Sequence, residues 1–462
     1  MDDLLARLGE ILGPGGLLTG AEVAGRRAGP WAGSGTIVAK AIARPRETAQ
    51  VAAVMKLCHE ARQPVIPFGG LTGLVHGTAS GPDDLLLSLE LMNHIENVDP
   101  VGRTMQVQAG CLLQQIQEAA EHEGLLFPLD LGARGSCTIG GNVSTNAGGN
   151  RVIRFGMTRE LVLGLEAVLA DGTVISSMNS MLKNNAGFDL KQLFIGTEGV
   201  LGIVTRLVLR LREAPASQNT AFVAFADFPS VTAFLKHADR RLGGSLSAFE
   251  VLWRDVYDLL TSPPAAGRPP LERGAPFYAL VESLGGDQEG DDIRFTAALE
   301  AALESGLIVN AAIARNLAER NAMWGIRDDV GQFQRFAPVT GFDVSLPIRD
   351  MDAYGETLAR GIRARWPEGR IWIFGHLGDG NLHVVVGVGS ADEDTKRAVD
   401  EIVYRPLAAL GGSVSAEHGI GLDKKPHLGL SRNAEEIALM RRLKAMLDPR
   451  NILNPGKVLE MP

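Results

Sequence analysis

A strand–helix–strand pattern near the N-terminus is the feature that most limits what this chain can fold into. An apolar run at 36–43 precedes a segment with helical spacing at 47–61, and a second apolar run follows at 64–68. The apolar positions at helical spacing are Val51, Val54, Met55 and Cys58. The pattern predicts an α/β domain. Further strands are predicted at 84–91, 104–110, 161–170 and 202–211.

The pattern restarts after a linker-like stretch at 213–218, so a first domain is expected to end near residue 215. The segments that follow predict an α+β domain built on an antiparallel sheet, with helices on one face. Its predicted strands are 221–228, 246–253 and 276–282, and its predicted helices are 230–242 and 290–305. The last part of the chain reads as helical. The chain is therefore expected to divide into a first domain at 1–215, a second domain at 216–420 and a C-terminal helical segment at 421–462.

Composition excludes several classes of protein. The chain has 462 residues, of which 45% are hydrophobic and 21% charged, which is enough for more than one buried core. A net charge of -9 without a block of basic residues argues against nucleic acid as a partner. Three cysteines without a CxxC pair suit a reducing compartment. No apolar stretch approaches the ~20 residues of a transmembrane helix, and residues 1–12 do not resemble a targeting peptide. A cytoplasmic location is expected.

Two glycine-rich loops are candidates for binding a ligand. The first, PFGGLTGL at 67–74, follows a predicted strand, and its glycines allow backbone N–H groups to converge on an anion; such a loop is also often a plain turn. The second, SCTIGGNVSTNAGG at 136–149, is too polar for a core strand and too rich in donors for a linker. The chain lacks both GxGxxG after a strand and GxxxxGK[ST], so any dinucleotide must be held in another way.

Seven segments together resemble the vanillyl-alcohol-oxidase-type flavoproteins, and among them the FAD-linked dehydrogenases of D-2-hydroxyglutarate, D-lactate and glycolate. The resemblance follows the chain in order and covers nearly all of it. The segments are 67–74, 128–149, 162–175, 183–205, 375–383, 411–421 and 451–457.

This resemblance implies a fold and a cofactor site. The fold would be α+β, with an α/β FAD-binding domain formed by both ends of the chain and a cap domain of antiparallel sheet and flanking helices between them. Leu71 stands where relatives with covalently attached FAD often carry a histidine, so non-covalent FAD is expected; His76 is a less favoured attachment point. The implied FAD-binding residues are Pro67, Gly69, Gly70, Leu71, Thr72, Gly73, Leu74, Asp130, Ser136, Thr138, Gly140, Gly141, Asn142, Thr145, Asn146, Gly149, Glu198, Gly202, Ile203 and Asn454.

Three residues form a candidate metal site. GHLGDGNLH at 375–383 reads as two strands joined by a tight turn, which can bring His376 and His383 to the same end of a hairpin. With Glu417 they would give two imidazoles and a carboxylate, a set that suits zinc and also Mn or Fe(II). The spacing alone leaves open a glycine-rich hairpin with two surface histidines. The resemblance implies zinc on these three residues and His418 as the catalytic base.

The oxidation needs both the metal and the base. Oxidising a secondary alcohol removes the hydroxyl proton while the hydrogen on C2 leaves as hydride, here to flavin N5. A metal bound at the hydroxyl stabilises the developing negative charge, and an imidazole can accept a proton near neutral pH.

The expected substrate site departs from the D-2-hydroxyglutarate pattern. Arg327 stands at the place of a carboxylate-binding arginine, although a surface arginine paired with Asp328 or Glu319 would look the same. Three polar groups of the pattern are replaced by Gly331, Gly341 and Val385, and Arg335 is a candidate second cation. We therefore expect a monocarboxylic D-2-hydroxy acid to be the substrate.

Three alternatives stay open. The first is a dehydrogenase of D-2-hydroxyglutarate or D-malate, the second is a non-catalytic subunit that carries FAD, and the third is an oxidase that passes electrons to O2. The resemblance also implies an electron acceptor, which would be an electron-transferring flavoprotein, a quinone or a cytochrome, and a homodimer.

Overall fold

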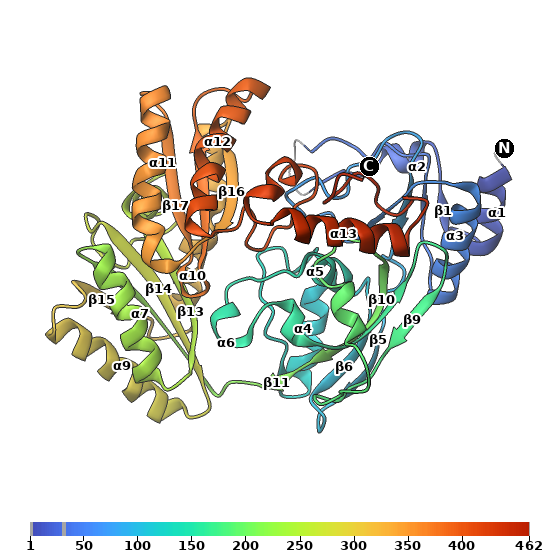
Figure 1. The fold of residues 1–462 in the computed structure, drawn as a ribbon. Helices are drawn as coiled ribbons and strands as arrows, with labels where there is room; N and C mark the ends of the chain where they lie inside the picture. The colour runs from blue at the N-terminus through green and yellow to red at the C-terminus, as the bar shows by residue number, and fades with distance from the viewer. Residues whose placement is uncertain (1–2, 30–33, 462) are drawn as a thin grey trace. The chain divides into compact units, whose positions relative to one another are not determined.

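The chain folds into two compact units, each with its own sheets (Figure 1). The structure is a computed structural model, and it describes residues 3–29 and 34–461. Unit 1 comprises 1–148, 156–214 and 417–462, and unit 2 comprises 149–155 and 215–416. The first and last parts of the sequence therefore share one unit.

Unit 1 contains a small sheet with a parallel centre. Strands β2 (Ala41–Ala43) and β3 (Val65–Phe68) each pair in parallel with β4 (Leu85–Ser88), and β1 (Leu17–Leu18) joins β2 antiparallel. Nearly every residue of the parallel strands is buried, as expected where both faces are covered. Helix α3 (Thr48–Ala61) links β2 to β3. The predicted strand–helix–strand pattern is confirmed, with a first strand shorter than expected.

The second sheet of unit 1 is antiparallel, with the strand order β5-β6-β10-β8-β9. Its strands are β5 (Ile95–Asp99), β6 (Thr104–Gln108), β8 (Val162–Val168), β9 (Val174–Ser177) and β10 (Ile203–Arg210), and β7 (Leu125–Leu126) pairs separately with β11 (Arg212–Glu213). The helices of this unit include α1 (Asp3–Leu12), α2 (Ala21–Ala24), α4 (Leu113–His122), α5 (Ile139–Thr145) and α13 (Ala434–Leu447), with shorter 3-10 turns η1 (Thr158–Leu161), η2 (Leu190–Leu193) and η6 (Lys425–Leu430).

A buried lysine ties the end of the chain to unit 1. Lys444 lies in α13, and its Nζ donates to Asp448 Oδ2 at 2.6 Å and to the backbone oxygens of Val200 at 3.0 Å and Leu453 at 2.6 Å. A buried ammonium is tolerated when its hydrogen bonds are satisfied in this way. The three bonds hold the segment that carries Asn454.

Unit 2 is built on a seven-stranded antiparallel sheet with the order β15-β12-β14-β13-β17-β18-β16. The strands are β12 (Ser217–Phe225), β13 (Leu246–Trp253), β14 (Phe277–Gly285), β15 (Asn310–Ile313), β16 (Thr340–Ser345), β17 (Arg370–His376) and β18 (Asn381–Gly387). The helices are α6 (Val152–Phe155), α7 (Phe228–Leu242), α8 (Arg254–Thr261), α9 (Gln288–Glu304), α10 (Leu317–Asp328), α11 (Met351–Arg365) and α12 (Glu393–Leu410), with η3 (Val330–Phe336), η4 (Ile348–Asp350) and η5 (Leu377–Asp379).

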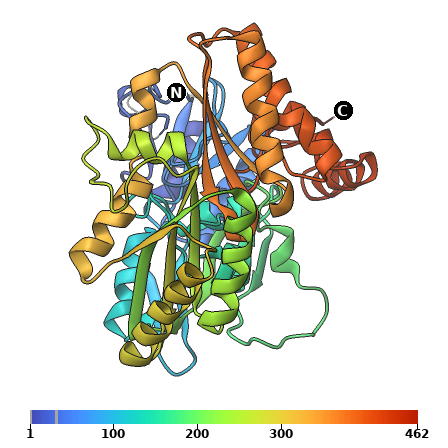
Figure 2. The ribbon, with the colours of Figure 1, turned by 90° about the vertical axis from the view of Figure 1, so that its left-hand side faces the viewer.

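Helices cover both faces of this sheet (Figures 1 and 2), whereas the sequence predicted a cover on one face. On one face, Phe222 and Leu252 pack with Tyr257 of α8. On the other, the rings of Phe225 and Phe249 pack at a tilt against Phe234 of α7. The physical reason is that these strands carry apolar side chains at both alternating positions, so each face must be buried. The expected antiparallel sheet with flanking helices is confirmed.

Taken from the sequence alone, the segment 324–336 looks helical. In the structure, α10 ends at Asp328, and a separate 3-10 turn, η3, follows from Val330. Asp329 has a non-helical ψ of 44°, and its side chain accepts from Gln332 Nε2. Within the described residues, no helix is both long and apolar enough to cross a membrane.

Candidate active site

Unit 1 encloses a cavity of about 350 Å³. Its wall combines the loop after β3, the segment that leads into α5, the start of β10, and two residues from the start of the last segment of the unit, Glu417 and His418. Segments far apart in the sequence therefore meet around one hollow, as is common for cofactor sites.

Backbone contact between the two glycine loops shapes this cavity. A Cβ on Gly70 would lie 1.9 Å from the backbone oxygen of Ser136, and one on Gly69 would lie 2.2 Å from Thr138 Oγ1. Any side chain at either position would push the loops apart. The glycines of PFGGLTGL are thus required for packing against the segment that begins α5.

Unpaired polar atoms show that the site fits a polar cofactor. Asn142 lines the cavity, and its Oδ1 is buried without a hydrogen-bond partner among the described residues. Asn454 Oδ1 is likewise buried and unpaired among those residues, although Asn454 is not part of the lining. Buried polar atoms are rarely left unpaired in a complete complex. Leu71 and Glu198 also line the cavity, with φ values of 54° and 53° that non-glycine residues seldom adopt. Such strain is typical of ligand sites.

Most of the residues implied by the resemblance line this cavity. They are Pro67, Gly69, Gly70, Leu71, Thr72, Gly73, Leu74, Thr138, Gly140, Gly141, Asn142, Thr145, Glu198, Gly202 and Ile203.

Five of the implied residues lie outside the lining of this cavity: Asp130, Ser136, Asn146, Gly149 and Asn454. Sequence reasoning in turn missed other lining residues, among them Val75, Leu131, Ala133, Cys137, Ser144 and Ala147. These are small or apolar, and no sequence signal separates them from ordinary core residues.

Glu198 holds the loop that follows His418. Its carboxylate accepts hydrogen bonds from the backbone N–H groups of Ile420 at 2.6 Å and Gly421 at 2.8 Å. Burial raises the pKa of Glu198 above its ordinary value, although these two bonds and the charge of Lys424 oppose the shift. The family resemblance implies a cofactor role for Glu198, and the structure adds this contact with the loop that follows His418.

In unit 2, four polar side chains form a row across one face of the sheet. Glu250 pairs with His376 across β13 and β17, and His383 pairs with Asp343 across β18 and β16. The rings of His376 and His383 meet edge to face, with their centroids 5.2 Å apart. Alternate strand residues share a face, so the strand register alone brings these side chains together. The predicted hairpin therefore does bring the two histidines together.

Glu250 and Arg327 surround His376. Glu250 Oε1 lies 2.6 Å from His376 Nδ1, Glu250 Oε2 accepts from Arg327 Nε at 2.8 Å, and Arg327 Nη2 lies 3.3 Å from His376 Nε2. Burial would raise the pKa of Glu250, but the charges of His376 and Arg327 outweigh it and hold that pKa well below the ordinary value. The guanidinium of Arg327 thus lies beside His376, buried and not on the surface.

Asp343 was not found from the sequence. It is fully buried, and it accepts from Asn381 Nδ2 at 2.9 Å, from the backbone N–H of Ala416 at 3.0 Å and from Ser415 Oγ at 3.3 Å. These bonds fix the segment that runs directly into Glu417 and His418. No sequence signal marked Asp343, because only the pairing of β16 with β18 places it opposite His383.

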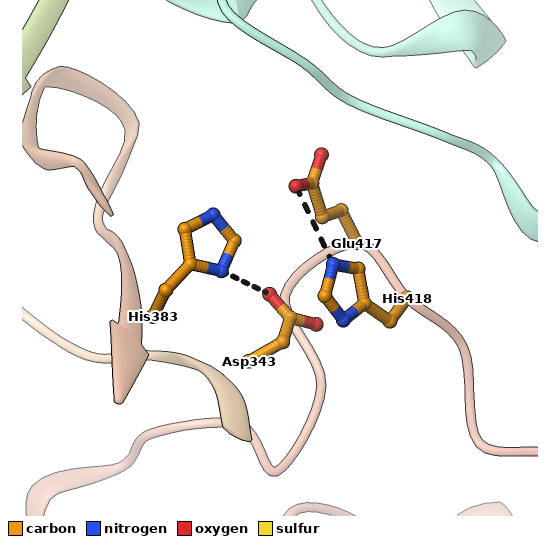
Figure 3. A group of neighbouring side chains, drawn as sticks. All are labelled: Asp343, His383, Glu417 and His418. Carbon is orange, nitrogen blue, oxygen red and sulfur yellow. Dashed lines mark ion pairs between the residues drawn. The ribbon is translucent and has the colours of Figure 1, made fainter. Parts of the chain in front are cut away.

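Asp343, His383, Glu417 and His418 form a group of four residues that could hold a metal ion (Figure 3). One candidate ligand atom from each lies within 4.8 Å of the others. His383 Nδ1 lies 4.0 Å from Asp343 Oδ1, and His418 Nε2 lies 3.9 Å from Glu417 Oε1. His376 is not one of these four; it lies next to His383 and contacts Glu250.

The other residues of the predicted substrate site, Val385, Gly341 and Arg335, have different surroundings. Val385 packs against the aromatic cluster that includes Phe333 and Trp372, and it lies opposite Gly341 across β16 and β18. A Cβ on Gly341 would meet nothing within 4 Å. Arg335 is exposed, with its guanidinium over the ring of Phe336. The face beside the histidines is therefore largely apolar.

Comparison with known proteins places the chain in a family. The C-terminal domain of FAD linked oxidases matches residues 214–458, and an FAD binding domain matches 39–177. The chain is similar to the mitochondrial D-2-hydroxyglutarate dehydrogenase of Bos taurus, with 41% identity over 423 residues, 91% of this chain and 77% of that protein. The mitochondrial enzyme of the same name from Arabidopsis thaliana is 39% identical over 90% of this chain and 74% of its own length.

Solved structures show the same fold at low identity. Substrate-bound p-cresol methylhydroxylase superposes with a TM-score of 0.79 and 16% identity, over 99% of this chain and 97% of its own. Alkyldihydroxyacetonephosphate synthase superposes with a TM-score of 0.78 and 16% identity, over 99% of this chain and 86% of its own. The expected vanillyl-alcohol-oxidase-type fold is confirmed. The chain belongs to the FAD-linked oxidase family and is an FAD-dependent oxidoreductase.

Proposed function

We propose that this protein oxidises a D-2-hydroxy acid to the 2-oxo acid, with FAD as the hydride acceptor. One observation carries the proposal: Glu417 and His418, a carboxylate and an imidazole, line the cavity of the unit that contains the FAD binding domain. The likeness to two D-2-hydroxyglutarate dehydrogenases supports the reaction class.

The donor set fits a divalent cation. His376 has Glu250 beside its Nδ1 at 2.6 Å, and His383 has Asp343 beside its Nδ1 at 4.0 Å. Metal-binding histidines commonly place a carboxylate at the ring nitrogen that does not bind the metal. We therefore assign His376, His383 and Glu417 as ligands, with Zn²⁺ first and Mn²⁺ or Fe²⁺ as alternatives.

Asp343 has a different proposed role. Its oxygens already accept hydrogen bonds from Asn381, Ser415 and Ala416, so it suits orienting His383 better than binding the cation. When bound, the cation would stabilise negative charge on the substrate hydroxyl oxygen.

His418 is the proposed base. It stands beside Glu417 on the wall of the FAD cavity, and imidazole is the side chain best suited to accept a proton near neutral pH. Arg327 would bind the substrate carboxylate through its Nη atoms, since Glu250 holds its Nε.

D-2-hydroxyglutarate is the first substrate to test, because the two relatives described above are named as dehydrogenases of this acid. A monocarboxylic D-2-hydroxy acid is the second candidate. The observation in its favour is the apolar surrounding of Val385 and the open space at Gly341, which offer a second carboxylate no evident donor. To bind the second carboxylate of a dicarboxylic acid, the exposed side chain of Arg335 would have to turn toward Val385 and Gly341.

An anaerobic titration tests the proposal. The holoenzyme is mixed with D- and L-forms of 2-hydroxyglutarate, lactate, malate and longer 2-hydroxy acids, before and after chelation, while flavin absorbance is followed. A D-2-hydroxy acid should bleach the flavin, and chelation should slow the bleaching. A flavin that none of these acids reduces would contradict the proposed reaction.

Several features of the enzyme remain proposals. These are non-covalent attachment of FAD, given Leu71 in the first loop, a homodimer, and an electron-transferring flavoprotein, quinone or cytochrome as the acceptor. A cytoplasmic location also remains a prediction, and the two relatives described above are named as mitochondrial.

A further inference from the structure

Glu250 is an unusual residue for its position in unit 2. It lies in the middle of β13, a strand of otherwise mostly apolar buried residues, and only 1% of its surface is exposed. A buried carboxylate is costly unless charged or hydrogen-bonding partners compensate for the lost water. The strand therefore carries a cost that an apolar residue at this position would avoid.

The two oxygens of Glu250 serve two different partners. Oε1 faces Nδ1 of His376 at 2.6 Å, and Oε2 accepts from Nε of Arg327 at 2.8 Å. The 2.6 Å distance between Oε1 and Nδ1 is that of a hydrogen bond, and a carboxylate already paired with a guanidinium accepts that bond from Nδ1–H of His376. In the neutral ring, this leaves the lone pair on Nε2, which lies 3.3 Å from Arg327 Nη2 in this structure, so binding a metal there would require Nη2 to turn from Nε2 toward the substrate.

The same carboxylate orients Arg327. The guanidinium is planar and rigid, so a bond to Nε sets the direction of both Nη atoms. The guanidinium carbon of Arg327, Cζ, lies 5.7 Å from the centre of the Phe374 ring. That ring in turn packs on the ring of His383. Arg327 and His376 are thus aligned together.

We infer that Glu250 is a positioning residue that links the metal site to the substrate-carboxylate site by holding His376 in one tautomer and Arg327 in one plane. This inference rests on the proposed function. Glu250 contacts neither reacting atoms nor cofactor in this assignment, and it acts through the two residues it binds.

The substitution Glu250→Gln is the most informative test. An amide keeps the size of the side chain but has one accepting oxygen and one donating nitrogen, so it can satisfy only one of the two donors. Glu250→Asp keeps the charge but shortens the reach. Glu282→Gln is the matched control: Glu282 is a buried carboxylate on the adjacent strand β14, but its partners are Arg151, Gln218, Ser247 and Trp324.

Three quantities are measured on each FAD-loaded protein: the affinity for Zn²⁺ in competition with a chromophoric chelator, the KM and kcat for the best D-2-hydroxy acid, and the flavin absorbance per protein. Glu250→Gln should weaken Zn²⁺ binding by about 10- to 100-fold and raise KM, with flavin content unchanged. Glu250→Asp should recover part of the Zn²⁺ affinity. Glu282→Gln should leave both the Zn²⁺ affinity and KM near wild type.

The outcomes separate this inference from the proposed function. Wild-type protein that binds Zn²⁺ and turns over, together with a Glu250→Gln variant of equal Zn²⁺ affinity and KM, would overturn the inference alone. Wild-type protein that binds no Zn²⁺ and whose flavin no D-2-hydroxy acid reduces would overturn both. Should Glu250→Gln not fold, Glu250→Asp decides: weakened Zn²⁺ binding in a folded protein supports the inference, and wild-type affinity and KM contradict it.

Discussion

Glu198 accepts a 2.6 Å hydrogen bond from the backbone N–H of Ile420, two residues after the proposed base His418. A second bond from Gly421 completes the contact, so one carboxylate on the cavity wall holds the loop that leads away from the base.

Removing this carboxylate should loosen the loop. Glu198→Ala leaves two backbone donors without their acceptor, which costs about 1–3 kcal/mol for each group that stays buried. We expect a lower melting temperature and a lower ratio of flavin to protein absorbance, with Glu198→Gln milder because it keeps one acceptor. Unchanged flavin content in Glu198→Ala would show that the loop does not depend on this contact.

Asn142 should contribute to FAD affinity and little to the stability of the apoprotein. Its buried Oδ1 has no partner within the described part of the chain, so Asn142→Ala removes an acceptor that FAD would satisfy. We expect FAD binding about 10-fold weaker, equal to about 1.4 kcal/mol, by flavin fluorescence titration of apoprotein. An equal loss of apoprotein stability would instead indicate a structural role.

Acid should destabilise unit 2 through Glu282. Burial would raise the pKa of Glu282, but Arg151, with its charge and hydrogen bond, and further bonds from Gln218 and Ser247 hold it below the ordinary 4.5. Between the two pKa values the unfolded chain binds more protons, so this contribution to stability is complete above the ordinary pKa and is lost as pH falls below it.

Melting temperatures of wild type and Glu282→Gln should therefore converge as pH falls below the ordinary carboxyl pKa of 4.5. At neutral pH the variant should be less stable by about 2 kcal/mol or more, because Arg151 loses a buried charged partner. Glu401→Gln, which removes an exposed pair with Arg405, is the control and should change little.

His383 should be needed for metal binding. His383→Ala removes a proposed ligand, and we expect metal content by mass spectrometry to fall at least about 10-fold and flavin reduction to slow in parallel. Chelated wild-type enzyme should recover with Zn²⁺ or Mn²⁺, whereas the variant should not. His94→Ala, at an exposed histidine of unit 1, should retain full metal content.

A new donor beside His383 should change substrate preference. Val385→Asn places an amide within the apolar surroundings of Val385, and a hydrogen bond to a charged group is worth about 1.5–3 kcal/mol. The ratio of kcat/KM for D-2-hydroxyglutarate to that for D-lactate should rise about 10-fold or more. A ratio that stays constant would indicate that the side chain of the substrate lies elsewhere.

The sequence predicted several strands and helices of both units where apolar residues repeat at clear spacings, but not β15, β16, α11 or α12 of unit 2. Strand 246–253 was placed at its observed bounds. The sequence did not predict that helices cover the second face of the unit 2 sheet, since the apolar spacing in α8 and α10 does not show which face they cover.

The candidate site could be predicted only where residue types are chemically distinctive. Histidines and glycine loops give such signals, and they led to His376, His383 and Glu417. Asp343 and Glu250 give none, because each is a single acidic residue inside a strand, and only the pairing of strands places it beside a histidine.

The row Glu250, His376, His383 and Asp343 depends on how four strands are aligned, not on the conformation of any loop. A slip of β17 or β18 by one residue would turn its histidine to the opposite face of the sheet. Single insertions or deletions inside these strands should therefore abolish function, while the proline-rich connection at 261–270 should tolerate changes in length.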